Sequence, residues 1–169
     1  MKRAKHIGFT LIELLVVIFI ISIVSGVALL SIGHNQSKKI QSFTNQVAET
    51  LLLAQQQAML QPAVIGIYLT EQALQFYDLH TQPGGKSKWL PRSDRLLETL
   101  NVPDGMEIKL SHTLKLKTQE TQKERSPQII ISSNGDVTPF MLYLGANNDK
   151  PRYVIQGDVN GSITQQTIS

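Results

Sequence analysis

The 169-residue chain contains no cysteine, which limits the chemistry open to it. A disulfide framework, a cysteine-ligated metal site and a cysteine nucleophile are all excluded. Histidines are few, and no two of them stand three or four residues apart, as a helical metal site would require: His6, His34, His80 and His112. The sequence suggests no Ser-His-Asp set and no catalytic pair of carboxylates. We therefore expect no metal, no cofactor and no enzymatic activity.

Charged residues are missing from one long stretch of the chain, Leu14–Ile32, and no proline precedes Pro62. Counted from Phe9, the apolar run is 24 residues long, whereas roughly 20 suffice to cross the hydrocarbon core of a bilayer. An ordinary secretory signal peptide is the alternative, but its apolar core is only about 7 to 15 residues long. We therefore predict a transmembrane helix over residues 9–33.

One acid, Glu13, stands inside the start of this apolar run. A charge within a spanning helix costs about 2.5 to 3.5 kcal/mol, so a charged residue there is a functional candidate and is expected to pair with a group of opposite charge. If the chain were cleaved between Gly8 and Phe9, a new amino group would form at Phe9, about 6 Å of helix rise from Glu13. That amine is the natural counter-ion.

Three basic side chains at the start of the chain, Lys2, Arg3 and Lys5, account for its whole excess of positive charge. They are three of 16 basic residues, and the remaining 13 equal the acidic residues, also 13, in number. The net charge therefore gives no indication of nucleic-acid binding. Basic residues on one side of an apolar span set its orientation instead, with the N-terminus in the cytoplasm and the C-terminal domain outside.

Beyond residue 33 the pattern remains that of a helix, over residues 34–61, and this part is amphipathic. Pro62 is the expected stop. For Gly26, close packing between helices and the general tolerance of membrane helices for small residues are both open. The apolar stripe of the amphipathic part has members spaced by three or four residues: Ile40, Phe43, Val47, Leu51, Ala54 and Ala58.

Residues 62–169 have the shorter periods of a sheet domain. Asn134-Gly135 and Asn160-Gly161 are strong two-residue turn signals. Residues 158–161 share the opening of a calcium loop, but Gly161 comes two positions too early for one, so a turn is the better interpretation. Pro139 indicates a strand that starts late or lies at a sheet edge. Strands are expected at residues 64–69, 74–79, 106–110, 128–132, 137–144, 152–156 and 162–164, with mobile loops at about 81–95 and 111–127.

A group of basic residues surrounds Trp89 in the first of these loops: Lys86, Lys88, Arg92 and Arg95. A basic loop with one stacking aromatic is one way to bind single-stranded nucleic acid. Asp94 and Glu98 dilute the charge, however, and a single tryptophan in a small domain is typical of a core anchor. Nucleic acid is therefore a disfavoured partner.

The segment Gly8-Phe9-Thr10-Leu11-Ile12-Glu13, followed by the apolar run, resembles the processing signal of type IV pilins and type II secretion pseudopilins. The resemblance implies that a prepilin peptidase removes residues 1–8 by cutting after Gly8, that Phe9 is then N-methylated, and that Glu13 acts in subunit assembly. It also implies a pilin-like α+β fold, in which one long N-terminal helix packs on a mostly antiparallel β-sheet domain. Many pilins have a proline late in the membrane segment, and this chain does not, so we expect no fixed kink.

The later part of the chain is similar, segment by segment and in the same order, to the H-class minor pseudopilins of type II secretion (GspH). Related minor pilins of type IV pili share the domain more loosely, and the lack of a cysteine pair favours the secretion branch. The segments that carry the likeness are Trp89-Leu90-Pro91, residues 100–106, the Asn-Gly-Asp-x-Thr-Pro-Phe run at 134–140, and residues 157–161.

This resemblance implies a structural and assembly component near the tip of the type II secretion pseudopilus, which supports the export of folded exoproteins. The expected location is the inner membrane, with a single pass and a periplasmic C-terminal domain, and then the periplasmic pseudopilus. Expected partners are other minor and major pseudopilins, the peptidase that also methylates Phe9, membrane lipid and secreted exoproteins. The alternative is a minor pilin of a type IV pilus that binds DNA in natural transformation.

Overall fold

The computed structural model describes the backbone of residues 10–92, 94–111 and 126–168, and the side chains of the same residues apart from 27–35. Two predicted features lie outside the described residues: the cleavage position between Gly8 and Phe9, and most of the loop expected at 111–127. The chain divides into two compact units, Met1–Lys39 and Ile40–Ser169. The second unit holds the hydrophobic core.

One helix, α1 (Leu11–Leu60), runs through the end of the first unit and the start of the second. The stripe predicted from the sequence is its buried face in the second unit: the six residues from Ile40 to Ala58 are each at most 4 % exposed. Thr44, the one polar residue among the fully buried positions described, donates its hydroxyl to the Ile40 carbonyl at 2.8 Å. The helix ends one residue before its predicted end, because Pro62 cannot continue it.

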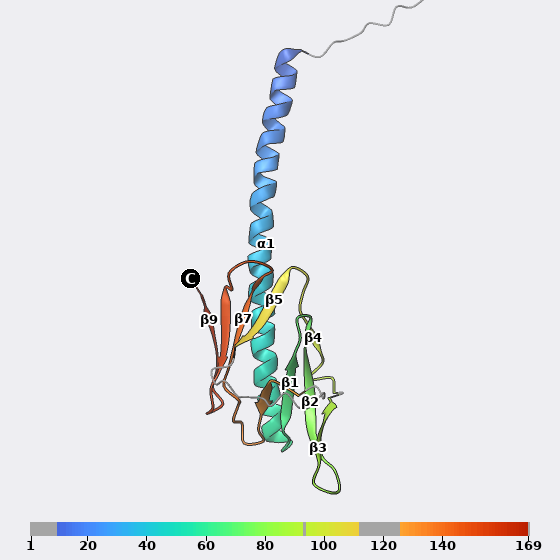
Figure 1. The fold of residues 1–169 in the computed structure, drawn as a ribbon. Helices are drawn as coiled ribbons and strands as arrows, with labels where there is room; N and C mark the ends of the chain where they lie inside the picture. The colour runs from blue at the N-terminus through green and yellow to red at the C-terminus, as the bar shows by residue number, and fades with distance from the viewer. Residues whose placement is uncertain (1–9, 93, 112–125, 169) are drawn as a thin grey trace, which may run out of the picture. The chain divides into compact units, whose positions relative to one another are not determined.

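Two antiparallel sheets pack against this part of α1 (Figure 1). Sheet A has the order β3-β2-β1-β6, with β4 also pairing with β2, and sheet B has the order β5-β7-β8-β9. The strands of sheet A are β1 (Ile65–Leu69), β2 (Ala73–Thr81), β3 (Ser87–Pro91), β4 (Leu100–Asn101) and β6 (Ile129–Ile131). The strands of sheet B are β5 (Met106–Ser111), β7 (Phe140–Ala146), β8 (Tyr153–Gly157) and β9 (Ile163–Thr167).

The strands predicted from the sequence are present, with shifts of a few residues at their ends. Pro139 acts as expected: β7 starts only at Phe140, while Val137 makes an isolated bridge to Ile131. Two strands were not predicted. Residues 87–91, expected to be part of a loop, form β3, because a tight turn at Gly84 and Gly85, both with positive φ, folds them back onto β2. The two-residue β4 has too few residues to show a period.

Both predicted Asn-Gly turns are confirmed, and they meet at one side chain of the helix. Gly135 and Gly161 have φ values of 90° and 80°, a region that favours glycine. The Gln55 side-chain nitrogen donates to the carbonyls of both glycines, at 2.7 Å each. The turn that follows sheet A strand β6 and the turn that joins sheet B strands β8 and β9 are thus both fixed to α1.

Candidate assembly site on the long helix

The first turn of α1 carries Glu13, the candidate site residue that lies within the described part of the chain. Thr10 caps the helix: its side-chain oxygen accepts from the Glu13 N–H at 3.3 Å, and its carbonyl accepts from the same N–H at 3.1 Å. A threonine cap followed three residues later by a glutamate is the spacing of a capping box. The Thr-x-x-Glu spacing is present in the sequence at residues 10–13, so this cap is a feature that the sequence alone could have predicted.

Glu13 is therefore placed where the helix favours a negative charge. The unpaired N–H groups of the first turn give this end of a helix a partial positive charge, so a carboxylate there is stabilised by about 0.3 to 1 kcal/mol. An amino group at the same end would have the opposite, unfavourable effect. A new amine at Phe9 would consequently need a carboxylate close to it.

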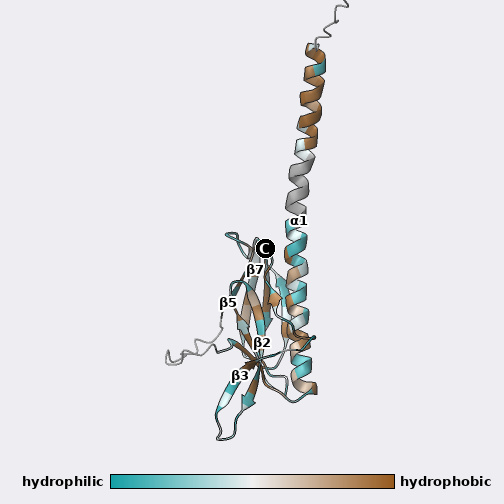
Figure 2. Ribbon diagram, turned by 90° about the vertical axis from the view of Figure 1, so that its right-hand side faces the viewer, coloured by the Kyte–Doolittle hydropathy of each residue, from teal (hydrophilic) through white to brown (hydrophobic). Residues whose placement is uncertain are grey.

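The helix after Glu13 consists almost entirely of hydrophobic residues, brown in Figure 2. Apart from Ser22, each residue from Leu14 to Val24 has a large apolar side chain that is exposed, so such side chains lie on every side of this part of the helix. Those between Leu11 and Val24 are 44 to 85 % exposed within the chain itself. Side chains of this kind each gain about 1.5 to 3 kcal/mol when they are taken out of water, so this segment requires a covering partner. Among the described residues, no helical segment is both long and apolar enough to cross a membrane. The transmembrane helix over residues 9–33 therefore stays a prediction.

Two residues of the basic loop that the sequence analysis disfavoured as a nucleic-acid contact, Arg92 and Trp89, are engaged within the fold. The other basic residues of this loop are exposed: Lys86, Lys88 and Arg95. Arg92, only 8 % exposed, donates to Asp78 at 2.8 Å and to Asp94 at 2.6 Å. Trp89 is half-buried in β3, and a Cβ added at Gly66 would come within 2.6 Å of its ring, so the tryptophan lies over the β1 backbone. Arg92 and Trp89 are thus engaged in the packing of sheet A.

The carboxylate of Asp94 has a pKa set by competing effects. Burial raises the pKa, but the hydrogen bond from Arg92, those from the backbone N–H groups of Leu97 and Leu96, and the Arg92 charge together outweigh it. The pKa of Asp94 therefore lies below its ordinary value. This carboxylate is ionised and held in place at neutral pH.

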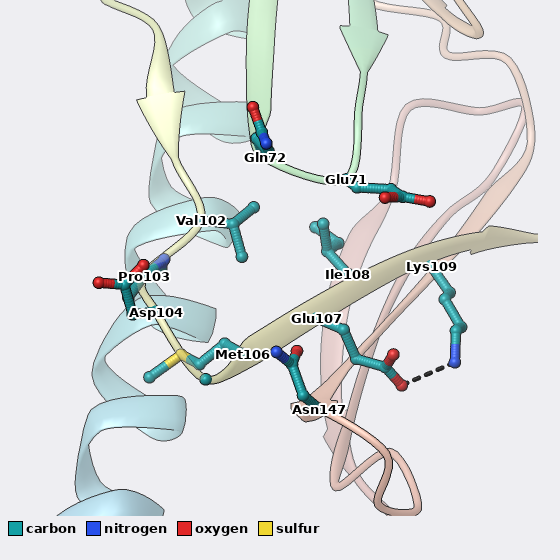
Figure 3. A pocket seen from close by; sticks show the side chains of 11 residues that line it. Glu71, Gln72, Val102, Pro103, Asp104, Met106, Glu107, Ile108, Lys109 and Asn147 are labelled. Atoms are coloured by element: carbon teal, nitrogen blue, oxygen red, sulfur yellow. Dashed lines mark hydrogen bonds and ion pairs between the residues drawn. The ribbon is translucent and has the colours of Figure 1, made fainter.

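A cavity of about 440 Å³ lies between the β1–β2 turn and the start of β5 (Figure 3). Glu71 and Gln72 lie on the turn, across from β5, where Glu107 pairs with Lys109 at 2.7 Å. Asn147 lies on the same side as Glu107. The lining of the cavity combines acids, amides and apolar side chains, and it holds no nucleophile beside a base.

No group of three or more residues able to hold a metal is found among the described side chains. Residues 158–161 form a hairpin turn, as predicted: the Gly161 N–H donates to the Asp158 carbonyl at 3.0 Å, and the Asp158 side chain accepts from the Val159 N–H at 2.7 Å. His80 is exposed at the end of β2. His6 and His112 lie outside the described residues, as does the side chain of His34.

Comparison with known proteins gives this arrangement a family. Residues 3–29 match the family described as the prokaryotic N-terminal methylation motif. The chain is 32% identical over 152 residues to the type II secretion system protein H of Pseudomonas aeruginosa, which covers 86% of each chain. It is 25% identical over 165 residues to the protein of the same name from Aeromonas hydrophila, over 91% of this chain and 88% of that one.

Solved structures share the fold at lower identity. The minor pseudopilin EpsH of the Vibrio cholerae type II secretion system is similar with a TM-score of 0.60 at 20% identity, over 79% of this chain and 94% of EpsH. GspH of Escherichia coli is similar with a TM-score of 0.55 at 18% identity, over 75% and 89%. These likenesses confirm the predicted pilin-like α+β fold. The Pseudomonas relative, by its identity and coverage, shows the family that the sequence predicts: this chain belongs to the type II secretion system protein H family.

Proposed function

We propose that the protein is a minor pseudopilin, made as an inner-membrane precursor and built into the tip region of the pseudopilus that exports folded proteins. It acts as a structural and assembly component. The observation that carries this proposal is the combination of a capped, acid-bearing helix start with apolar side chains exposed all round the segment that follows. Such a segment suits two apolar environments in turn, first lipid and then the helices of neighbouring subunits.

The transfer between these environments is inexpensive, because lipid tails and apolar side chains offer a helix similar contacts. Specific alignment of one subunit's helix with its neighbour's must then come from the charged groups at Phe9 and Glu13. After cleavage at Gly8, the Phe9 amine would be a charge with no partner in the apolar fibre core, where an unpaired charge costs several kcal/mol. Glu13 of the adjacent subunit neutralises it, and that pair fixes the register between the two helices.

The processing step is tested by replacing Gly8 with a bulky residue, as in Gly8→Leu. We expect the full-length precursor to accumulate in the membrane, because the peptidase then meets a side chain at the position where it cuts. The measurement is the mass of the protein recovered from the membrane fraction. Normal processing of this variant would falsify the peptidase assignment.

The pairing step is tested by Glu13→Ala, with Glu13→Asp as the matched control that keeps the charge. We expect Glu13→Ala to be cut and methylated normally but to recover its partner pseudopilins poorly in pull-downs. Glu13→Asp should recover more of them. An undiminished yield of partners with Glu13→Ala would remove the basis for the pairing.

A further inference from the structure

Apart from the two-residue β4, the described strands form four outer edges of the two sheets, and three of these are protected against pairing with another strand. Pro91 removes a backbone donor from β3. Residues beyond β6 cover its edge, through the bridge from Val137 to Ile131. Charged side chains, Glu107 and Lys109, stand on β5. Proline, charge and covering segments are the devices by which natural proteins block their sheet edges.

The fourth edge, β9, has none of these devices within the described part of the chain. Its sequence, Ile-Thr-Gln-Gln-Thr, contains no charge and no proline. Four of its five residues are exposed, and it forms the outer strand of sheet B on the side opposite β5 (Figure 1). Gln165 touches the helix, through a 2.9 Å hydrogen bond from its side chain to Asn45. An open edge of this kind is a template for strand addition.

The register shows which backbone groups are available. The residues that flank the β8–β9 ladder are bonded to each other: the Asp158 N–H donates to the Ser162 carbonyl at one end, and the Ile168 N–H donates to the Arg152 carbonyl at the other. Because bonded residues alternate along an antiparallel ladder, Thr164 and Gln166 also face β8. Ile163, Gln165 and Thr167 consequently turn their N–H and C=O groups outward.

The direction of β9 indicates which kind of strand could pair with its free edge. All neighbours in sheet B are antiparallel, so β9 and β5 run in opposite directions. A subunit of the same fold, held in the same orientation, would therefore present the opposite edge of its sheet antiparallel to β9. Two copies of this chain are less suited, since pairing β9 with β9 would invert one copy and β5 carries charges.

We propose that the outward edge of β9 pairs, in antiparallel direction, with an edge strand of a different, neighbouring pseudopilin. This inference rests on the proposed function, because it requires that subunits stand side by side in one orientation. The outward groups of Ile163, Gln165 and Thr167 supply the backbone bonds. The uncharged side chains of Thr164 and Gln166 leave the partner strand free of charge repulsion.

The test uses the full chain in cells that produce the other pseudopilins, with Gln166 replaced by the photoreactive amino acid p-benzoylphenylalanine. Position 166 is exposed on β9; the control position is the exposed Lys109 on β5. We expect an ultraviolet-dependent adduct between position 166 and another pseudopilin, identified by mass spectrometry. No such adduct is expected from position 109.

A second change separates backbone pairing from mere proximity. Gln165→Pro removes an outward N–H and no bond to β8, so the domain should fold and resist protease, while the adduct is lost. Gln165→Ala keeps the N–H and loses only the side-chain contact with Asn45, so the adduct should persist.

Each remaining outcome would overturn the inference. An adduct that survives Gln165→Pro would rule out backbone pairing, and an adduct formed only with a second copy would rule out the named occupant. Absence of an adduct, while the other pseudopilins still co-purify with the chain, would reject the β9 edge and leave the proposed function intact. If none of them co-purifies, both proposals fail.

Discussion

Gln55 joins the helix to two separate turns of the second unit. It is part-buried on α1, and its single side-chain nitrogen serves two carbonyls that lie 80 and 106 residues further along the chain. A Cβ added at Gly161 would meet this nitrogen at 2.6 Å and would also contact the Gly135 carbonyl. The site therefore requires glycine in the turns as well as the amide on the helix.

Replacing Gln55 by leucine should destabilise the domain by about 1 to 3 kcal/mol, because two part-buried carbonyls would lose their donor. The measurement is the urea unfolding midpoint of a fragment of residues 36–169, which retains the whole core. Gln56→Leu is the matched control, since Gln56 is exposed on the same turn of the helix. Equal midpoints for the two variants would show that the bonds to the turns contribute nothing to stability.

At the residue scale, the sequence predicts what depends on neighbouring positions. The Asn-Gly dipeptides predict their turns because only the local backbone must adopt positive φ. The Thr10 cap could have been predicted too, from the Thr-x-x-Glu spacing. The Gln55 bonds could not, because glutamines are frequent along this helix and only the folded arrangement of both turns selects one of them.

Among the elements, β3 shows most clearly why a strand escaped prediction. Four of its five residues are exposed, so it lacks the alternation that marks a half-buried strand. Its position depends on contacts made elsewhere: Trp89 lies over Gly66 of β1, where Pro127 also packs. The helix stripe, in contrast, was predicted residue by residue, because burial there repeats with the helical period.

The segment after β3 is tied to β2 by an ion-pair cluster as well as by backbone bonds, which run from the Arg92 N–H to the Phe76 carbonyl and between β4 and β2. Arg92 bridges Asp78 of β2 and Asp94, and Asp94 in turn accepts from the N–H groups of Leu96 and Leu97. Leu97 is 1 % exposed and belongs to the core. The ion-pair cluster thus helps to hold Leu97 in the core, because Asp94 bonds to the Leu97 backbone.

This cluster predicts a pH dependence of stability. The pKa of Asp94 is lowered on folding, so its stabilising contribution is complete above the unfolded-state pKa of about 3.9 and is lost as the pH falls through the folded-state value. Asp94→Asn should therefore be less stable than the wild type at pH 6, and the difference should shrink toward pH 3.

The measurement is the urea midpoint of the wild-type and Asp94→Asn fragments at both pH values. Asp104→Asn is a suitable control, since Asp104 is exposed and makes none of these contacts. A difference between wild type and Asp94→Asn that is the same at pH 6 and pH 3 would contradict the assignment.

At the scale of the whole molecule, the two units divide the proposed task. The first contains the residues that match the N-terminal methylation motif, with Glu13 among them, and an exposed apolar surface that no described part of the chain covers. The second has its own core and the exposed edge strand β9. The sequence predicts the apolar run and the strand-rich part of the chain, since both are local signals, but not a boundary between Lys39 and Ile40. It does not predict that the strands separate into two sheets, because strand pairing joins residues far apart in the chain.

The proposed function depends most on a role in type II secretion. The direct measurement is the protein content of culture supernatant and periplasm in a deletion strain, with and without the restored gene. We predict that exported proteins are trapped in the periplasm of the deletion strain and are released when the gene is restored. Normal secretion combined with a loss of piliation or of transformation would contradict the account and would move the protein to a type IV pilus.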